Sequence, residues 1–315
     1  MSALERLGIN RHRALFDEDC SPEQRQTADC FAFKWSKRDT YESEGMKNFS
    51  KNWLIDRYCG GNIDKLTEWL EGARKIILDA GCGSGYSAIL FFGDQLKNHD
   101  YLGVDISSAV NVAQCRFEEM GYPGDFLQWD LKDVPIPDAS VDLIFAEGVL
   151  HHTESVEGSL KYLAKKLKNG GRFLFYVYAK KSIVREFTDD LIRKRIQNLS
   201  DEQAWQALMP LTKLGNVLGD MEVEIEVPED IPLLDIEEGK IDLQRFFYWH
   251  ICKLFYAPDL TLEEMNHINF DWFRPLHCHR HTPEEIEDFC AGAELTIEHM
   301  DVQRSGVTVV ALREQ

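Results

Sequence analysis

The sequence lacks any apolar run long enough to cross a lipid bilayer. Its longest, Phe173 to Ala179, spans seven residues, whereas a membrane-spanning helix needs about 20. The first residues carry charges, Glu5 and Arg6, where a signal peptide has its apolar segment. We therefore expect a soluble, cytoplasmic protein that does not bind a membrane.

The cysteines are not spaced as they are in disulfide-rich or zinc-binding domains. None of the eight cysteines forms a C-x-x-C pair or a tight cluster, which excludes a zinc finger and a disulfide scaffold. We expect free thiols, many of them buried as small apolar side chains, at Cys20, Cys30, Cys59, Cys82, Cys115, Cys252, Cys278 and Cys290.

Basic residues are scarce relative to acidic ones. The chain has 35 Lys+Arg and 54 Asp+Glu, a net charge of −19, and such a chain repels nucleic acid unless it presents a basic patch. Its densest basic stretch, residues 185–195, is interrupted by Glu186, Asp189 and Asp190, which is typical of a self-paired, solvated helix face. We expect a small-molecule acceptor rather than nucleic acid as partner, and a homodimer is compatible with the sequence.

Short apolar segments alternate with helical ones from Lys75 onward. This order is typical of a parallel sheet covered by helices on both faces. The helix expected at 156–167 should end at Asn169-Gly170-Gly171, a C-cap signal. The strands are predicted at 76–78, 101–104, 126–129, 141–146 and 173–179, with further helices at 86–92 and 110–120.

The strand–helix alternation stops for about a hundred residues and then resumes at Thr282. There, Thr282 and Glu285 form a predicted capping box, and strands at 295–302 and 307–312 should form a hairpin at the sheet edge. Within the interruption, Met221 to Val227 alternates strictly and predicts a half-exposed strand. The predicted divisions are an N-terminal extension or lid at 1–72, a core at 73–180, a cap insertion or substrate lid at 181–281, and the last helix and hairpin of the core at 282–315.

A glycine-rich turn follows the first strand of this core. Its glycines, Gly81, Gly83 and Gly85, are spaced G-x-G-x-G, which departs from the dinucleotide fingerprint, and the Lys of a phosphate-binding P-loop is missing. Asp79, just before the turn, would repel a pyrophosphate. A carboxylate there suits a ligand that carries an ammonium group and a sulfonium.

Four segments in order resemble the motifs of class I S-adenosylmethionine-dependent methyltransferases. Residues 76–85 are similar to the first motif, 104–107 to the second acidic strand end, and Asp130-Leu131 to the third. Residues 141–152 resemble the fourth strand of the small-molecule branch that includes ubiquinone-biosynthesis enzymes. The resemblance implies an α/β, Rossmann-like methyltransferase fold with a mostly parallel sheet and an antiparallel terminal hairpin, and S-adenosylmethionine as cofactor.

The resemblance also implies roles for individual residues. The glycines would let the backbone approach the methionine part of the cofactor, and Asp79 would lie near its amino group. Asp105 would accept the ribose hydroxyls, and Glu147 would lie near the transferable methyl group. The expected cofactor-binding residues are Asp79, Gly81, Cys82, Gly83, Gly85, Asp105, Ile106, Asp130, Leu131 and Glu147; for each carboxylate, a cap or turn role remains the alternative.

Methyl transfer asks little of the protein beyond alignment, removal of a proton and exclusion of water. The candidate general bases are His151, His152 and Glu147. A purely structural role for the histidine pair stays open.

Aromatic residues outside the core motifs suggest a cover for the site. Trp35 and Arg38 could fold over the cofactor, with Arg38 on its carboxylate, although packing is the alternative for both. The insertion offers an acceptor pocket in which Arg274 would bind a carboxylate or phosphate. Its candidate lining is Tyr248, His250, Tyr256, Trp272 and Arg274, with simple core packing as the alternative.

Three histidines alternate just before the last helix, at His277, His279 and His281. On a strand they would share one face, as metal ligands do. No carboxylate or cysteine completes a metal motif, so we expect no metal, and an exposed connector is the simpler interpretation.

These observations favour a methyltransferase acting on a small or medium-sized metabolite, with an O, N or C acceptor atom. Two alternatives remain: the same fold using a modified cofactor or a non-methylating reaction, and a non-catalytic cofactor-binding scaffold or regulator. A tRNA or protein methyltransferase is disfavoured by the acidity and by Ala146-Glu147-Gly148-Val149, where an Asn-Pro-Pro-Tyr-like motif would stand.

Overall fold

The computed structural model describes residues 2–9 and 21–314 in two compact units. The larger unit takes in the described residues up to Ser36, together with 48–179 and 277–314. The smaller unit consists of 37–47 and 180–276. Cys20 lies outside the described residues, and the seven cysteines within them form no disulfide.

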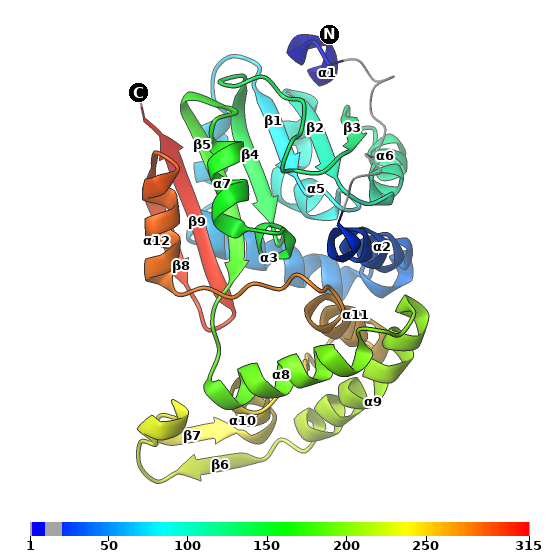
Figure 1. The fold of residues 1–315 in the computed structure, drawn as a ribbon, viewed down its shortest axis with the longest axis vertical. Helices are drawn as coiled ribbons and strands as arrows, with labels where there is room; N and C mark the ends of the chain where they lie inside the picture. Colours follow the sequence, from blue (N-terminus) through cyan, green and yellow to red (C-terminus); the bar gives the residue numbers. More distant parts are fainter. Residues whose placement is uncertain (1, 10–20, 315) are drawn as a thin grey trace. The chain divides into compact units, whose positions relative to one another are not determined.

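A seven-stranded sheet forms the centre of the larger unit, in the order β3-β2-β1-β4-β5-β9-β8 (Figure 1). Strands β1 to β5 are parallel, β9 is antiparallel to β5, and β8 is antiparallel to β9. This confirms the predicted fold class and the terminal hairpin. The strands are β1 Ile76–Ala80, β2 Asp100–Asp105, β3 Asp125–Gln128, β4 Val141–Glu147, β5 Leu167–Tyr178, β8 Leu295–Val302 and β9 Gly306–Arg313.

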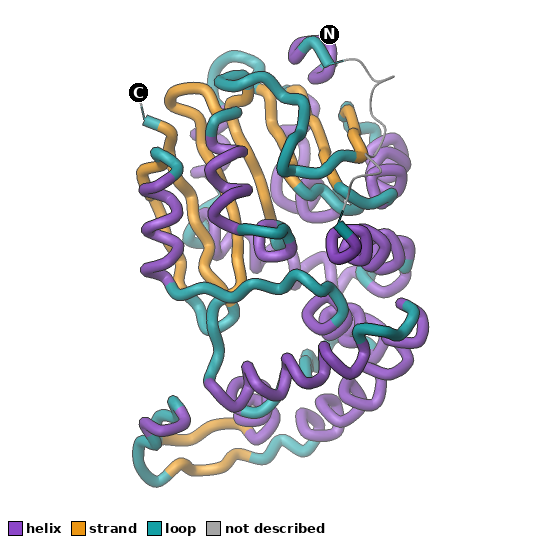
Figure 2. Tube along the Cα trace, viewed as in Figure 1, coloured by secondary structure: helices purple, strands orange, loops and turns teal. Residues whose placement is uncertain are grey.

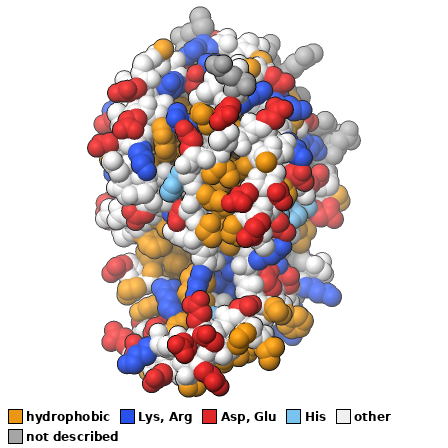
Figure 3. All heavy atoms as spheres, turned by 90° about the vertical axis from the view of Figure 1, so that its left-hand side faces the viewer, with side chains coloured by type: hydrophobic (Ala, Val, Ile, Leu, Met, Phe, Trp, Pro, Cys, Tyr) orange, Lys and Arg blue, Asp and Glu red, His pale blue; other side chains and the backbone are white. Residues whose placement is uncertain are grey.

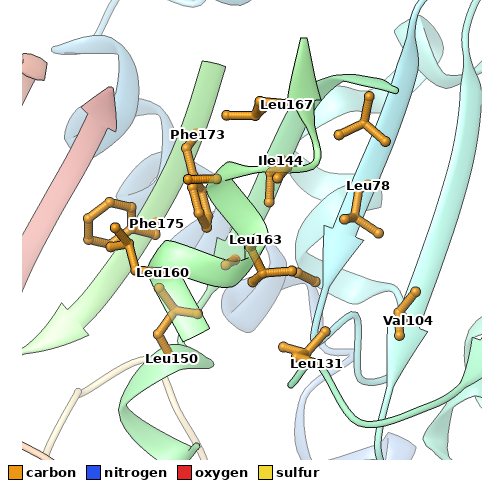
Figure 4. Packing of buried hydrophobic residues seen from close by; sticks show 14 of the residues in the cluster. Leu78, Val104, Leu131, Ile144, Leu150, Leu160, Leu163, Leu167, Phe173 and Phe175 are labelled. Carbon is orange, nitrogen blue, oxygen red and sulfur yellow. The ribbon is translucent and has the colours of Figure 1, made fainter. Parts of the chain in front are cut away.

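Helices cover both faces of this sheet because both faces are apolar. On one face lie α1 (Ala3–Leu7), α7 (Val156–Ala164) and α12 (Pro283–Gly292). Figure 4 shows the packing of α7, whose Leu160 and Leu163 belong to the same apolar cluster as Ile144 and Phe173 of the sheet. On the other face lie α3 (Glu44–Cys59), α4 (Asp64–Leu70), α5 (Tyr86–Phe92) and α6 (Ala109–Met120), and α2 (Pro22–Ser36) packs beside α6.

The predicted end of helix 156–167 is wrong. Helix α7 ends at Ala164, and the Asn169-Gly170-Gly171 segment lies within β5 instead of capping a helix. The physical reason is strand pairing: the backbone N–H groups of Ser140 and Val141 donate to the carbonyl of Lys166. The register then shifts, from Val141 opposite Leu167 to Leu143 opposite Arg172, so the glycines form a bulge. The predicted capping box of α12 is confirmed, with Thr282 and Glu285 as its two members.

The smaller unit is mainly helical. Its helices are α8 (Ile183–Ile196), α9 (Asp201–Asp220), α10 (Leu243–His250) and α11 (Leu262–Phe273). The predicted strand is present as β6 (Glu224–Val227), with exposed glutamates, and Figure 2 shows it beside β7 (Gly239–Asp242). Short 3-10 helices complete the described chain at Arg38–Thr40, Gly93–Lys97, Leu150–His152 and Pro232–Leu234.

Two surface properties bear on function. None of the helices in the described part of the chain is long and apolar enough to pass through a membrane. On the face drawn in Figure 3, acidic and basic side chains are interspersed.

Candidate cofactor site

The glycine-rich turn joins β1 to α5 at the carboxyl edge of the sheet. Gly81, Gly83 and Gly85 all have positive φ, at 87°, 50° and 70°, a conformation that residues with a Cβ rarely adopt. The turn is anchored at both ends. The N–H groups of Gly81 and Cys82 donate to the carbonyl of Val104 at 2.7 and 2.9 Å.

A buried arginine holds the second half of this turn. Arg116 of α6 is 4% exposed and donates through Nη1 to the carbonyl oxygen of Ser84 at 2.7 Å and to its Oγ at 2.8 Å. The turn is therefore a rigid cradle of backbone rather than a loose loop, as a ligand-binding turn must be.

The protein's own packing also requires these glycines. A Cβ on Gly81 would lie 2.3 Å from Val149, and one on Gly85 would lie 2.9 Å from Phe117. A Cβ on Gly83 would lie 2.6 Å from Nε1 of Trp35. The predicted close approach of a cofactor to this turn stays a prediction, with packing as a second reason for the glycines.

Asp105 ends β2, and one of its carboxylate oxygens binds the turn while the other binds Ser107. Oδ2 accepts from the N–H of Gly83 at 2.8 Å, and Oδ1 accepts from the N–H and Oγ of Ser107 at 2.8 and 2.6 Å. Burial raises the pKa of Asp105, while these bonds and the charge of Lys34 oppose the rise. These three bonds leave about one of the four lone-pair sites of the carboxylate, on Oδ2, to accept a ribose hydroxyl.

Asp79 lies in β1, 22 residues before Tyr101 of the neighbouring strand, which donates from its hydroxyl to Oδ2 at 2.6 Å. Burial raises the pKa of Asp79 to about 7, with Asp105 and Glu147 adding repulsion and the Tyr101 bond opposing it. A buried carboxyl in this state lacks a cation. The ammonium group of an amino-acid ligand would supply one.

Trp35 at the end of α2 covers the turn, and Lys34 lies against it. The Nζ of Lys34 is 4.0 Å from the centre of the Trp35 ring, and Lys34 is 6% exposed. The sequence predicted that Trp35 covers the cofactor. It did not predict a role for Lys34, whose charge acts on Asp105. Its only signal in the sequence was its place within an aromatic and basic segment.

Three more of the expected cofactor-binding residues follow the ends of β3 and β2. Asp130 follows β3 and accepts from the N–H of Lys132 at 3.0 Å, and burial raises its pKa. Leu131 is 5% exposed and packs in the apolar core. Ile106 follows β2, and its carbonyl accepts from Nε2 of Gln128 at 3.1 Å.

Glu147 at the end of β4 belongs to a buried ion pair that sequence reasoning missed. Arg57 of α3 donates from Nη2 to Oε1 at 2.7 Å, and the hydroxyl of Tyr58 donates to Oε2 at 2.5 Å. The Arg57 guanidinium lies 3.2 Å from the ring centre of Trp53 and 3.9 Å from that of Tyr176. Nothing in the sequence links Arg57 to Glu147, because they are 90 residues apart.

The histidine pair is enclosed within the larger unit. His151 is 0% exposed and stacks on Tyr178 with ring centres 3.7 Å apart. His152 is 3% exposed, and its Nδ1 is 2.7 Å from the carbonyl oxygen of His277. This geometry supports a packing role and leaves the proposed role as a base untested.

The segment of alternating histidines runs along the turn after β4. The N–H of His279 donates to the carbonyl of His151 at 2.9 Å, and its Nε2 is 3.0 Å from the carbonyl oxygen of Thr153. Nδ1 of His281 contacts Glu285 at 3.2 Å. Within residues 2–9 and 21–314, no group of three or more His, Cys, Asp or Glu side chains is arranged to hold a metal ion.

The predicted acceptor residues of the smaller unit fall into separate groups. Arg274 bonds to Asp201 at the start of α9 at 2.6 Å, whereas the ring of Tyr256 packs on Gly219 near its end. Those two positions are 18 residues apart, or about 27 Å along a helix. Tyr248 and Trp272 instead both lie against Arg185.

Two further candidates also have local partners. His250 is buried beside Phe246, with ring centres 5.3 Å apart. Arg38, proposed for the cofactor carboxylate, lies in the smaller unit and pairs with Glu42 at 2.6 Å.

The strand order and the glycine turn flanked by strand-end carboxylates define a class I methyltransferase core. Residues 78–175 match the family model described as a methyltransferase domain. This part of the chain is a methyltransferase domain of the class I, S-adenosylmethionine-dependent type. The residues fit that cofactor: Asp79 is a buried carboxyl, Asp105 is a firmly held carboxylate, and the glycine turn is a backbone cradle.

Relatives share this domain but not the whole chain. An uncharacterised methyltransferase of Bacillus subtilis, YcgJ, is 30% identical over 150 residues, 45% of this chain and 58% of the relative. A tRNA U34 carboxymethyltransferase of Shewanella piezotolerans is 32% identical over 150 residues, 42% of this chain and 44% of the relative. The chain thus spans about half the length of these relatives.

Among solved structures, the geranyl diphosphate C-methyltransferase of Streptomyces coelicolor, in complex with S-adenosylhomocysteine, is 12% identical with a TM-score of 0.48. The match covers 94% of this chain and 100% of that one.

Proposed function

We propose that this protein is a cytoplasmic enzyme that transfers a methyl group from S-adenosylmethionine to a small or medium-sized metabolite. One observation carries the proposal. The two carboxylates Asp79 and Asp105 flank a rigid glycine turn at the carboxyl edge of the sheet, within a methyltransferase domain. Ligands of open α/β sheets bind at that edge.

The core residues divide the binding task by charge. Asp79 is buried and would gain most from an ammonium group, while Asp105 would take the ribose hydroxyls. Lys34 places a cation beside Trp35 and Asp105. It is a candidate for the cofactor carboxylate alongside Arg38.

When bound, the cofactor supplies a methyl group that is already activated by its sulfonium. The protein must then align the acceptor, exclude water and take up the acceptor's proton. Glu147 is a candidate base by its position, because it ends β4 at the edge of the sheet where ligands bind. His151 and His152 remain candidates from the following turn.

A small acceptor is supported by the charge of the chain and by the insertion. At −19, the protein repels polyanions in general. The chain leaves the core after Tyr178, at the carboxyl end of β5, and returns at His277. Both connections are on the edge where ligands bind, and we propose that the insertion acts as a substrate lid.

A second candidate is transfer of a modified group. Several relatives are named tRNA U34 carboxymethyltransferase, and their names describe a carboxymethyl group and an RNA acceptor. The notion of an RNA acceptor conflicts with the acidity of this chain, whereas a modified group does not.

Mass spectrometry of the cofactor that co-purifies with the protein separates these candidates. Methyl transfer predicts S-adenosylmethionine or S-adenosylhomocysteine, and release of S-adenosylhomocysteine when metabolite extracts are added. A carboxylated cofactor would support the second candidate. Tight binding of S-adenosylhomocysteine with no turnover on metabolites or tRNA would point to a non-catalytic module.

A further inference from the structure

Four basic side chains in the smaller unit converge on one indole. The charged groups of Lys181, Arg185, Arg193 and Lys253 lie 5.5, 5.4, 4.9 and 5.0 Å from the ring centre of Trp272. They come from α8, the segment before it and the segment after α10. Such a concentration of cations is unexpected in a chain with a net charge of −19.

The centre of this cluster is buried. Arg185 and Asp189 are each 1% exposed, Trp272 is 2% exposed and Lys253 is 6% exposed. Lys181 and Arg193 are partly exposed, so the cluster reaches solvent on their side. The cations are therefore desolvated at one end and accessible at the other.

One buried carboxylate serves several donors here. Asp189 accepts from Nε of Arg185 at 3.2 Å, Nε1 of Trp272 at 2.8 Å and the N–H of Lys253 at 3.1 Å. Nη1 of Arg185 is buried and has no hydrogen-bond partner among the described residues. Nζ of Lys253 donates to the carbonyl of Ile268 at 3.1 Å, so the donor left unmatched at the centre is Nη1 of Arg185, and a buried charged donor without an acceptor is costly.

The remaining nearby carboxylates lie toward the surface. Asp190 pairs with Arg193 at 3.0 Å and is 55% exposed, and Glu186 accepts from the backbone N–H of Lys181 at 2.7 Å. The Asp190–Arg193 pair is exposed on its carboxylate side and is screened there by water. These carboxylates leave Arg185 as the buried cation in need of an acceptor.

Aromatic rings fix the orientation of that guanidinium. Its Cζ lies 4.6 Å from the ring centre of Tyr248, 5.6 Å from that of Trp249 and 5.4 Å from that of Trp272. An arginine held between aromatic rings presents its guanidinium N–H groups in a fixed geometry, so little conformational entropy is lost when an oxyanion binds. This arrangement matches an oxyanion attached to an apolar body.

We propose that the Arg185–Trp272 cluster binds the carboxylate or phosphate group of a small organic ligand. This site stands on the cluster itself and does not depend on the proposed function. Lys253 and Lys181 add charge, and Tyr248 and Trp272 contact the apolar part. Burial of Arg185 favours a small ligand over the backbone of a nucleic acid.

Calorimetry on the full chain with inorganic phosphate and with benzoate tests the proposal, each at constant ionic strength. We expect saturable binding of at least one probe, and the stronger one identifies the type of oxyanion. Arg185→Lys keeps the charge but loses the fork, and should weaken binding by about tenfold or more. Lys181→Gln, at a partly exposed position, should weaken it by about threefold or more and keeps the test valid if Arg185→Lys does not fold.

Lys194→Gln is the matched control, because Lys194 is an exposed lysine on the same helix. It should leave probe binding unchanged. Equal losses in Lys194→Gln and Lys181→Gln would indicate diffuse surface charge and overturn the site, as would absence of saturable binding in the wild type.

Binding of S-adenosylhomocysteine, measured on the same samples, separates the two proposals. A wild type that binds S-adenosylhomocysteine but neither probe refutes this site and leaves the proposed function standing. A wild type that binds a probe but not S-adenosylhomocysteine supports the anion site and refutes the proposed function.

Discussion

The indole of Trp35 lies directly over Gly83, so that a single methyl group on Gly83 would come within 2.6 Å of Nε1. Two segments 48 residues apart, the end of α2 and the glycine turn, are thereby in contact at the predicted methionine end of the cofactor site. Lys34 lies on the ring of Trp35. The lead-in helix is thus part of the site in the larger unit.

Gly83→Ala should destabilise the protein and weaken cofactor binding. The new Cβ meets Trp35, and φ of 50° is strained for alanine, which together should cost about 1–3 kcal/mol in the free energy of unfolding. Urea unfolding and calorimetry with S-adenosylhomocysteine measure the two effects. The double variant Gly83→Ala/Trp35→Ala should recover the part due to the clash, while unchanged affinity in Trp35→Ala alone would show that Trp35 only packs.

Asp105→Asn should lower the affinity for S-adenosylhomocysteine. The amide places an NH2 group against the donors of Gly83 or Ser107 and removes charge from the ribose acceptor, with a loss of about 1.5–3 kcal/mol per charge-assisted bond. Ser107→Ala is the control, since it removes one donor and keeps the carboxylate. Its affinity should stay within about threefold, or roughly 0.7 kcal/mol; normal affinity in Asp105→Asn would refute the ribose assignment.

Cofactor binding should weaken as the pH falls below 7. The pKa of Asp79 is raised to about 7 by burial, and the protonated carboxyl must lose its proton before it can pair with an ammonium group. Affinity for S-adenosylhomocysteine should fall by up to about tenfold per pH unit below that value. Calorimetry between pH 5.5 and 8 measures this, and Asp79→Asn should remove the dependence; a flat wild-type profile would contradict the assignment.

The Asp79 carboxyl should make the ligand-free protein less stable as the pH rises from 4 to 8. Because the folded pKa of Asp79 exceeds the unfolded value of about 4, its contribution to stability is full below pH 4 and is lost as the pH rises through 7. Asp79→Asn, which still accepts from Tyr101, should therefore raise the free energy of unfolding at pH 8 by about 2–4 kcal/mol. Urea unfolding should show this gain shrinking toward pH 4, and an equal gain at both pH values would refute the explanation.

Glu147→Gln should be strongly destabilising. It leaves the buried guanidinium of Arg57 without its counter-charge, and breaking a buried pair costs about 3–5 kcal/mol. Glu298→Gln is the matched control, because its pair with Arg172 is partly exposed and should contribute less than about 1 kcal/mol. Thermal and urea unfolding measure both, and similar small losses would show that the Glu147 pair is not structurally important. A stable Glu147→Gln that binds S-adenosylhomocysteine but forms none from S-adenosylmethionine in the presence of the acceptor would identify a base.

The order of strands and helices in the core was determined by the sequence alone, because local periodicity and turn residues specify such elements. Helix α5 spans Tyr86–Phe92 as predicted, and Asp105 and Asp130 stand at or just beyond strand ends. The end of α7 was not determined locally, since pairing of Ser140 and Val141 with Lys166 overrode the glycine signal.

Only the tertiary structure decided which side chains meet at the site. The contacts of Trp35 with Gly83, Arg57 with Glu147, and Arg185 with Trp272 join residues 48, 90 and 87 positions apart. No periodicity extends over such distances. The sequence also does not show which charged residues of a helix become buried when the chain folds. Burial then makes the difference: it raises the pKa of Asp79 and leaves Arg185 with a donor in need of an acceptor.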